Sequence, residues 1–177
     1  MMSHMLRFVR ENLAITVVCI AFALGLVYFA ARPHIVPEEK SFFSLFSLPL
    51  QDYQGKTVRL ATFETKPIVV YLWASWCPYC QEGFRNLSQA HSAHANIAFV
   101  AINRGEPFMD AKGFTDKIGL PAGIAYLLDP DDTFYKAIGG FAMPEYIFVD
   151  RRSTIVGHAR GPLTPEQLEE QIDMLLR

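Results

Sequence analysis

The 177-residue sequence has few cysteines and no excess of basic residues, and both shortages limit what the protein can be. Three cysteines are too few to hold a chain of this length together by disulfide bonds. The 16 Lys and Arg residues are balanced by 18 Asp and Glu residues, so the basic patch of a nucleic-acid-binding protein is missing. We therefore exclude nucleic acid as a partner. Hydrophobic residues make up 51% of the chain, which suffices for a folded core and argues against disorder.

Charged residues are also absent from residues 13–31. At about 1.5 Å per residue, a helix of this length matches the hydrocarbon thickness of a bilayer, so we predict a single transmembrane anchor there. Arg7 and Arg10 precede it, which favours a cytoplasmic N-terminus (residues 1–12) and a periplasmic position for the rest of this inner-membrane protein. The alternative is a cleaved signal peptide, but no small-x-small cleavage site follows the apolar run. Cys19 lies inside this run and is expected to be a packed or lipid-facing residue.

The remaining chain divides into a linker and one domain. Residues 32–45 mix proline, charged and polar residues without periodicity, which is typical of a tether. The domain then covers residues 46–177. It opens with a turn signal at Gln54-Gly55 between the short apolar stretches of residues 48–60, a pattern that predicts a β-hairpin.

A strand, a helix and a second strand follow in order. Residues 68–73 are apolar throughout and rich in β-branched and aromatic side chains, as in a strand buried on both faces. Apolar residues then recur at helical spacing up to about His94, and residues 97–102 form a second apolar run. The sequence therefore predicts a βαβ unit.

Helices and strands continue to alternate after this unit. The helices are predicted at residues 108–118, at a segment opened by Asp129-Pro130-Asp131-Asp132, and after the capping box Thr164-Pro165-Glu166-Gln167; the strands are predicted at residues 124–128, 146–149 and 155–159. The expected fold is α/β, with a mixed central sheet flanked by helices on both faces.

The chemical centre is the pair Cys77-Pro78-Tyr79-Cys80, which falls between the buried strand and the helix. At this position a thiol meets unpaired backbone N–H groups and the positive end of a helix, and both lower the pKa of a cysteine. We expect Cys77 to be the exposed, attacking thiol and Cys80, one turn into the helix, to resolve the mixed disulfide. A structural disulfide is an alternative.

Half of a zinc site is a further alternative, and it would need two more Cys or His ligands. His91 and His94 are the sole close histidine pair in the domain, and they lie more than two turns down the same predicted helix. We therefore predict no metal at the cysteine pair.

The segment Leu72-Trp73-Ala74-Ser75-Trp76-Cys77-Pro78-Tyr79-Cys80 resembles the active-site signature of the thioredoxin superfamily. It is most similar to TlpA-like, membrane-anchored thiol-disulfide oxidoreductases, a branch that includes cytochrome c maturation thioredoxins. The hairpin with Gly55, the segment 140–150 and the final helix follow in family order, over about residues 46–177. The resemblance implies a thioredoxin-like fold with an N-terminal β-hairpin, a redox-active disulfide and no cofactor.

The resemblance also implies roles for residues around the cysteines. Pro144 would be a cis-proline facing the dithiol, and Met143 would pair with the substrate backbone; from the sequence alone, Pro144 would be the start of a strand. Trp76, Pro78 and Tyr79 would complete the active site and contact the substrate.

Two positions depart from the family pattern. Thioredoxins commonly have a buried acid six residues before the first cysteine, where this chain has Tyr71, and many TlpA-like reductases have a glutamate three residues after the second, where it has Gly83. Glu82 and Glu145 are candidate proton-transfer groups in their place. Glu82 points about 200° around the helix from Cys80, however, and a solvated surface carboxylate is the alternative for both.

The function implied is reduction of disulfides in exported proteins, such as apocytochrome cysteines, with electrons from a transmembrane donor. An oxidase or isomerase uses the same residues, so the direction stays open. A copper(I)-binding thioredoxin-like module is the alternative from another class, since thiolates suit that ion.

Overall fold

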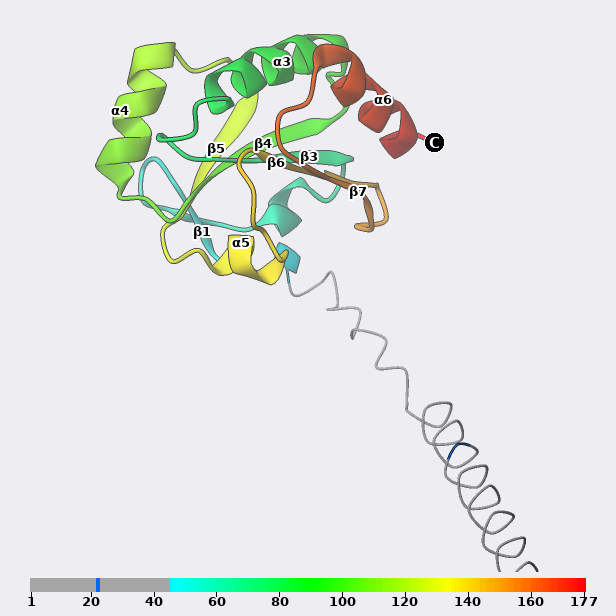
Figure 1. Ribbon diagram of the computed structural model, residues 1–177, viewed down its shortest axis with the longest axis horizontal. Coiled ribbons are helices and arrows are strands. Elements are labelled where there is room, and N and C mark those ends of the chain that lie inside the picture. Colours follow the sequence, from blue (N-terminus) through cyan, green and yellow to red (C-terminus); the bar gives the residue numbers. More distant parts are fainter. Residues whose placement is uncertain (1–21, 23–44) are drawn as a thin grey trace, which may run out of the picture. The chain divides into compact units, whose positions relative to one another are not determined.

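The computed structural model describes Phe22 and residues 45–177, the latter within one compact unit. Seven strands of this unit form one mixed sheet in the order β2-β1-β5-β4-β3-β6-β7 (Figure 1). Strands β3, β4 and β5 run parallel, and the remaining pairs are antiparallel. The strands are β1 (Leu50–Asp52), β2 (Thr57–Val58), β3 (Ile68–Trp73), β4 (Ala98–Arg104), β5 (Ile124–Asp129), β6 (Glu145–Val149) and β7 (Ile155–Arg160).

Helices cover both faces of this sheet. They are η1 (Leu60–Phe63, a 3-10 helix), α3 (Cys80–Ala93), α4 (Phe108–Ile118), α5 (Thr133–Ala137) and α6 (Pro165–Leu175). In Figure 1, α3 and α6 lie together above the sheet and α5 lies below it. The mixed sheet with helices on both faces confirms the predicted fold class.

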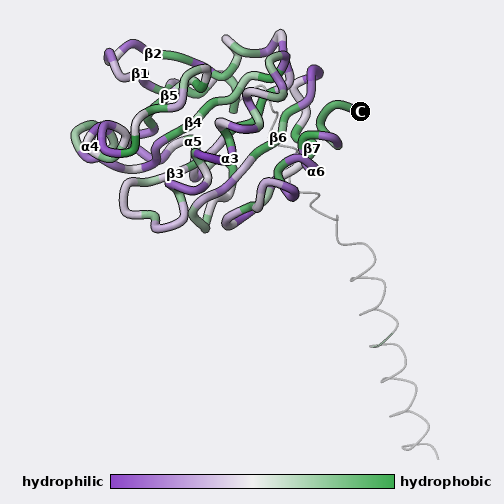
Figure 2. The backbone as a smooth tube through the Cα atoms, turned by 90° about the horizontal axis from the view of Figure 1, so that it is seen from above, coloured by the Kyte–Doolittle hydropathy of each residue, from purple (hydrophilic) through white to green (hydrophobic). Residues whose placement is uncertain are grey.

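Strand β3 is the centre of the core, because it pairs with β4 on one side and with β6 on the other. None of its six side chains is more than 1% exposed. Alternate side chains point to opposite faces, so β3 contributes to two hydrophobic clusters, one beneath α3 and α6 and one against α5 and η1. Figure 2 shows hydrophobic residues concentrated along the central strands.

Most predicted elements appear within a residue or two of the expected bounds. Helix α4 tolerates Gly113 in its interior. The capping box of α6 is present, because the Thr164 hydroxyl accepts from the Gln167 amide and the Gln167 side chain accepts from the Thr164 amide. Strands β6 and β7 are joined by the predicted Asp150–Ser153 turn.

One predicted helix start was wrong. Asp129 is the last residue of β5, and α5 begins at Thr133 rather than at the Asp129-Pro130 step. The Asp129 carboxylate reaches past the turn and accepts hydrogen bonds from the backbone N–H groups of Thr133 (2.9 Å) and Tyr135 (3.0 Å). The helix is therefore capped from a strand end and not by its own N-cap residue, Asp132, which has a left-handed backbone.

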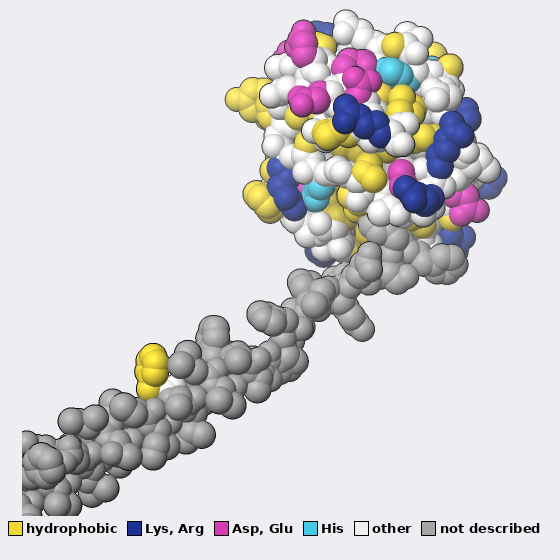
Figure 3. All heavy atoms as spheres, turned by 90° about the vertical axis from the view of Figure 1, so that its right-hand side faces the viewer, with side chains coloured by type: hydrophobic (Ala, Val, Ile, Leu, Met, Phe, Trp, Pro, Cys, Tyr) yellow, Lys and Arg dark blue, Asp and Glu magenta, His cyan; other side chains and the backbone are white. Residues whose placement is uncertain are grey.

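The N-terminal part of the domain contains a short antiparallel ladder, with Leu50 opposite Val58 and a turn at Gly55 between them. The predicted anchor at residues 13–31 lies, except for Phe22, outside the described residues. No helix among the residues that are described is long and apolar enough to cross a bilayer. On the face of the domain drawn in Figure 3, acidic and basic side chains are interspersed.

Candidate active site

The two cysteines lie where β3 ends and α3 begins, and they form a disulfide with a Cα–Cα distance of 5.4 Å. Cys77 ends a turn in which its N–H donates to the Ala74 carbonyl (3.2 Å), and the Cys80 N–H donates to the Cys77 carbonyl (3.3 Å). Cys80 is the first residue of α3, not one turn into it as predicted. The reason is that the first i→i−4 backbone hydrogen bond of the helix runs from the Gly83 N–H to the Tyr79 carbonyl, so the helix begins at the residue after Tyr79.

The two cysteine residues are less accessible than the sequence suggested. Cys77 is 3% exposed and Cys80 is not exposed at all, so the order of accessibility was predicted correctly but Cys77 is buried in the disulfide form. Both residues belong to the hydrophobic cluster beneath α3, which explains the burial. The adjacent aromatic residues are exposed in contrast, Trp76 by 61% and Tyr79 by 55%.

The peptide bond between Met143 and Pro144 is cis, as the family resemblance implied. Strand β6 starts at Glu145, directly after this bond, and Glu145 lies opposite Leu72 of β3. Because β3 and β6 are antiparallel, the start of β6 lies beside the end of β3, so the cis-proline is at the same edge of the sheet as the disulfide.

Glu145 is fully buried, so its interpretation as a solvated surface carboxylate was wrong. One carboxylate oxygen accepts from the backbone N–H groups of Phe141 and Ala142, both at 2.7 Å. The other lies 2.6 Å from His158 Nε2 and 3.8 Å from Arg160 Nε. These contacts compensate the charge and fix the segment before the cis-proline. Glu82, in contrast, is exposed on α3.

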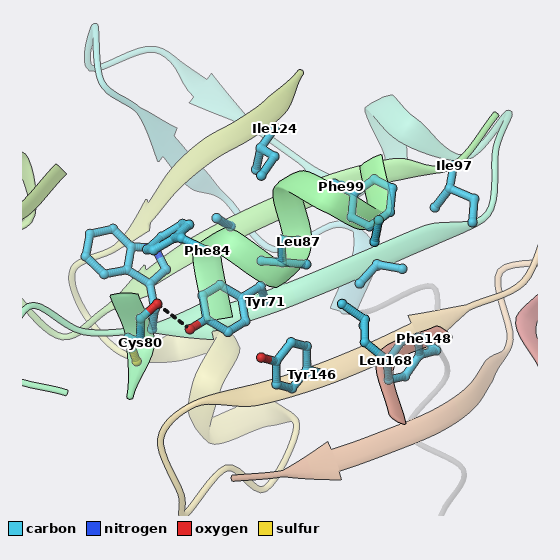
Figure 4. Close-up of a cluster of buried hydrophobic side chains, with 14 of the residues drawn as sticks. Tyr71, Cys80, Phe84, Leu87, Ile97, Phe99, Ile124, Tyr146, Phe148 and Leu168 are labelled. Carbon is cyan, nitrogen blue, oxygen red and sulfur yellow. Dashed lines mark hydrogen bonds between the residues drawn. The ribbon is translucent and has the colours of Figure 1, made fainter. Parts of the chain in front are cut away.

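Tyr71 and Gly83, the two departures from the family pattern, are neighbours in space. The Tyr71 hydroxyl donates to the Cys80 carbonyl (3.0 Å), and Figure 4 shows this bond beneath the start of α3. A Cβ atom on Gly83 would lie only 2.2 Å from the same hydroxyl and 3.0 Å from that of Tyr146. Glycine at position 83 therefore makes room for the tyrosine, and one departure explains the other.

The two tyrosine hydroxyls are neutral groups under the disulfide. Burial raises the pKa of Tyr71 well above its ordinary value, and the charge of Tyr146 would add to this effect. Burial raises the pKa of Tyr146 as well. The space beneath α3 thus holds hydroxyls that stay protonated, in place of an acid that would exchange a proton near neutral pH.

Sequence reasoning missed one buried acid of the site, Glu106, in the loop between β4 and α4. It is 8% exposed and accepts hydrogen bonds from Ser75 and Asn103. A signal was present, because Asn103 and Glu106 follow an apolar strand of a βαβ unit, and polar residues at the carboxyl ends of parallel strands often form sites. Among the residues with described positions, no group of three or more His, Cys, Asp or Glu side chains could hold a metal ion.

The chain is similar to a known family and to several known proteins. A family model described as Redoxin matches residues 37–175. Thiol-disulfide oxidoreductase ResA of Geobacillus thermodenitrificans is 22% identical over 128 residues, which are 71% of this chain and 72% of that protein. Soluble secreted antigen MPT53 of Mycobacterium tuberculosis is 25% identical over 163 residues, 90% of each chain.

Solved structures show the same fold. A putative thiol:disulfide interchange protein DsbE from Chlorobium tepidum has a TM-score of 0.66 and 25% identity, and the match covers 73% of this chain and 93% of that one. The structure of MTB dsbF in its mixed oxidized and reduced forms has a TM-score of 0.67 and 23% identity, and the match covers 75% of this chain and 97% of that one. The fold is thioredoxin-like, as the sequence resemblance implied.

The packing of Tyr71 against Gly83 predicts opposite effects for two helix glycines. We expect Gly83→Ala to lower the free energy of unfolding by about 2 kcal/mol, because the added methyl group would overlap the tyrosine hydroxyl. Gly113→Ala, in open space in α4, should instead raise it by about 0.5–1 kcal/mol. Urea unfolding of both variants measures the difference.

Shortening the tyrosine tests the cause. In a Tyr71→Leu background, Gly83→Ala should cost less than in the original protein, which a double-mutant cycle detects. Equal stability of the Gly83→Ala and Gly113→Ala variants would contradict this prediction. It would show that α3 shifts enough to accommodate the methyl group beside the Tyr71 hydroxyl at no cost in stability.

The buried contacts of Glu145 predict that hydrogen bonding, more than charge, determines its contribution. Glu145→Ala leaves the Phe141 and Ala142 N–H groups without their acceptor and should lower the free energy of unfolding by about 3 kcal/mol. Glu145→Gln keeps an oxygen that accepts from both N–H groups, so it should lower the free energy of unfolding by less than half as much as Glu145→Ala. Chemical unfolding checks the order, and equal losses for the two variants would contradict it.

Proposed function

Because the chain belongs to the Redoxin family, as a TlpA-like member of the thioredoxin superfamily, we propose that it reduces disulfides in exported proteins through Cys77 and Cys80. The protein is a protein disulfide oxidoreductase. The observation that carries the proposed role of the cysteines is their disulfide at the end of β3, at the same sheet edge as the cis peptide bond before Pro144.

The exchange proceeds in two steps. The Cys77 thiolate attacks one sulfur of the substrate disulfide, forming a mixed disulfide while the other substrate sulfur leaves as a thiolate. The Cys80 thiolate then attacks the Cys77 sulfur, releasing the second substrate thiolate and forming the Cys77–Cys80 disulfide. Two electrons pass to the substrate, and a dithiol donor must return two before the next cycle.

Several features support these roles. Cys77 is the more accessible cysteine and follows the exposed Trp76, whereas Cys80 is fully buried at the first position of α3. An incoming disulfide therefore meets Cys77 first. The exposed rings of Trp76 and Tyr79 offer apolar surface beside the disulfide, and the segment ending in Met143 and Pro144 offers backbone for an extended substrate.

The proposal extends to location and partners. The charge-free run at residues 13–31 supports a membrane anchor, with the domain on the periplasmic side. A protein held there would receive electrons from a transmembrane dithiol donor, and apocytochrome c cysteines before haem attachment are suitable substrates. This proposal gives the enzyme a place in cytochrome c maturation.

The mechanism predicts different behaviour for the two cysteine variants. Insulin reduction with dithiothreitol should be lost in Cys77→Ser, because no attacking thiol remains. Cys80→Ser should also turn over poorly, and it should accumulate a mixed disulfide with the substrate that non-reducing electrophoresis detects. The matched control is Cys19→Ser, which should be fully active. Activity that survived the double change of Cys77 and Cys80 would falsify the redox role.

Direction and location are tested together by thiol labelling in spheroplasts of cells that make the full chain. A bulky, membrane-impermeant maleimide should label Cys77, the more accessible cysteine, in a Cys19→Ser variant, because a periplasmic reductase is held mostly in its dithiol form. A label that adds only after dithiothreitol treatment would indicate an oxidase. Labelling that requires a membrane-permeant reagent would place the domain in the cytoplasm.

A further inference from the structure

Glu106 is a buried carboxylate that has no part in the exchange steps described above. One of its oxygens, Oε2, accepts from the Ser75 backbone N–H (2.7 Å) and from Asn103 Nδ2 (2.5 Å). The other, Oε1, accepts from the Ser75 hydroxyl (2.5 Å). With 8% of its surface exposed, Glu106 depends on these donors in place of water.

The three contacts join the cysteine loop to the neighbouring strand. Ser75 lies in the turn after β3, two residues before Cys77, and Asn103 lies in β4 opposite Trp73. Since β3 and β4 are parallel neighbours, their following loops leave the sheet at one edge, and Glu106 lies between them. The carboxylate therefore fixes the residue that leads into the attacking thiol.

The charge of Glu106 is not balanced by a cation. All three donors are neutral groups, and within residues 45–177 no Lys, Arg or His forms an ion pair with it. Glu145 differs in this respect, because His158 and Arg160 lie against it. A buried charge with neutral partners acts on its surroundings with little screening.

We propose that Glu106 is a positioning residue for Cys77 and that its negative charge makes the dithiol a stronger reductant. This inference rests on the proposed thiol-disulfide exchange. A thiolate exists only in the reduced form, so a carboxylate bound to Ser75, two residues before Cys77, would destabilise that form relative to the disulfide. The dithiol then gives up its two electrons more readily to a substrate disulfide, which becomes two thiols.

Two substitutions separate charge from contact. Glu106→Gln can place its amide oxygen at the position that accepts from Ser75 and Asn103, and its NH₂ group can donate to the Ser75 hydroxyl, so the shape is kept while the charge is removed. Glu106→Ala removes both. Ser75→Ala removes one contact and keeps the charge, and it remains informative if Glu106→Ala does not fold.

The experiment equilibrates the full chain with glutathione redox buffers and measures the fraction of Cys77–Cys80 disulfide. Glu106→Gln should shift the equilibrium constant about tenfold toward the dithiol, equivalent to a potential less negative by about 30 mV. The matched control is Asp110→Asn, an exposed carboxylate in the first turn of α4, which should shift it less than about twofold. Ser75→Ala should leave the potential unchanged.

Positioning is measured separately, by the rate of insulin reduction. Glu106→Ala should reduce it roughly tenfold, and Ser75→Ala should reduce it by a smaller factor. A potential in Glu106→Gln equal to that of the original protein would overturn the effect of charge, and an unchanged rate in both contact variants would overturn positioning. If the original protein failed to reduce insulin, the proposed function would fail, while the potentials would still show whether Glu106 acts on the dithiol.

Discussion

The pairing of β3 with β4 on one side and β6 on the other is the constraint on which the redox site depends. The strand is buried along its whole length, so its carboxyl end has a fixed place in the sheet. Each neighbour brings one acidic residue to that end. Glu106 follows β4 and binds the turn before Cys77, and Glu145 starts β6 directly after the cis-proline. Two buried carboxylates therefore lie near the carboxyl end of β3, one in the loop after β4 and one at the start of β6.

The space under α3 is filled differently from the family pattern. Tyr71 projects from β3 to the Cys80 carbonyl, and Gly83 is the residue that allows this approach. A carboxylate at position 83 would need the volume that the tyrosine ring occupies. Tyr71 therefore requires glycine at position 83, and the space beneath the resolving cysteine holds a neutral hydroxyl in place of an acid.

The sequence was sufficient for the parts of the fold that depend on local pattern. The six apolar residues of β3 and the Thr164–Gln167 capping box carry their signals within a few residues, and the cysteine pair between strand and helix marks the redox centre. Burial of Glu145 was not predictable in this way, because its partners are set by the pairing of β6 with β7 and by the turn before Pro144. The same holds for the cap of α5, where the Asp129 side chain reaches beyond the local turn.

Gly83 shows how a local conflict in a sequence can report a distant contact. Glycine is unfavourable inside a helix, so its presence in α3 indicates that something else approaches there, although the sequence does not say what. The structure identifies the hydroxyl of Tyr71, twelve residues earlier. That hydroxyl is neutral and Glu145 lies against His158 and Arg160, whereas the donors to Glu106 are neutral, so our proposal assigns the effect on the thiolate to Glu106. The proposed bias of the site toward giving up electrons would then come from the loop after β4, not from the helix that carries Cys80.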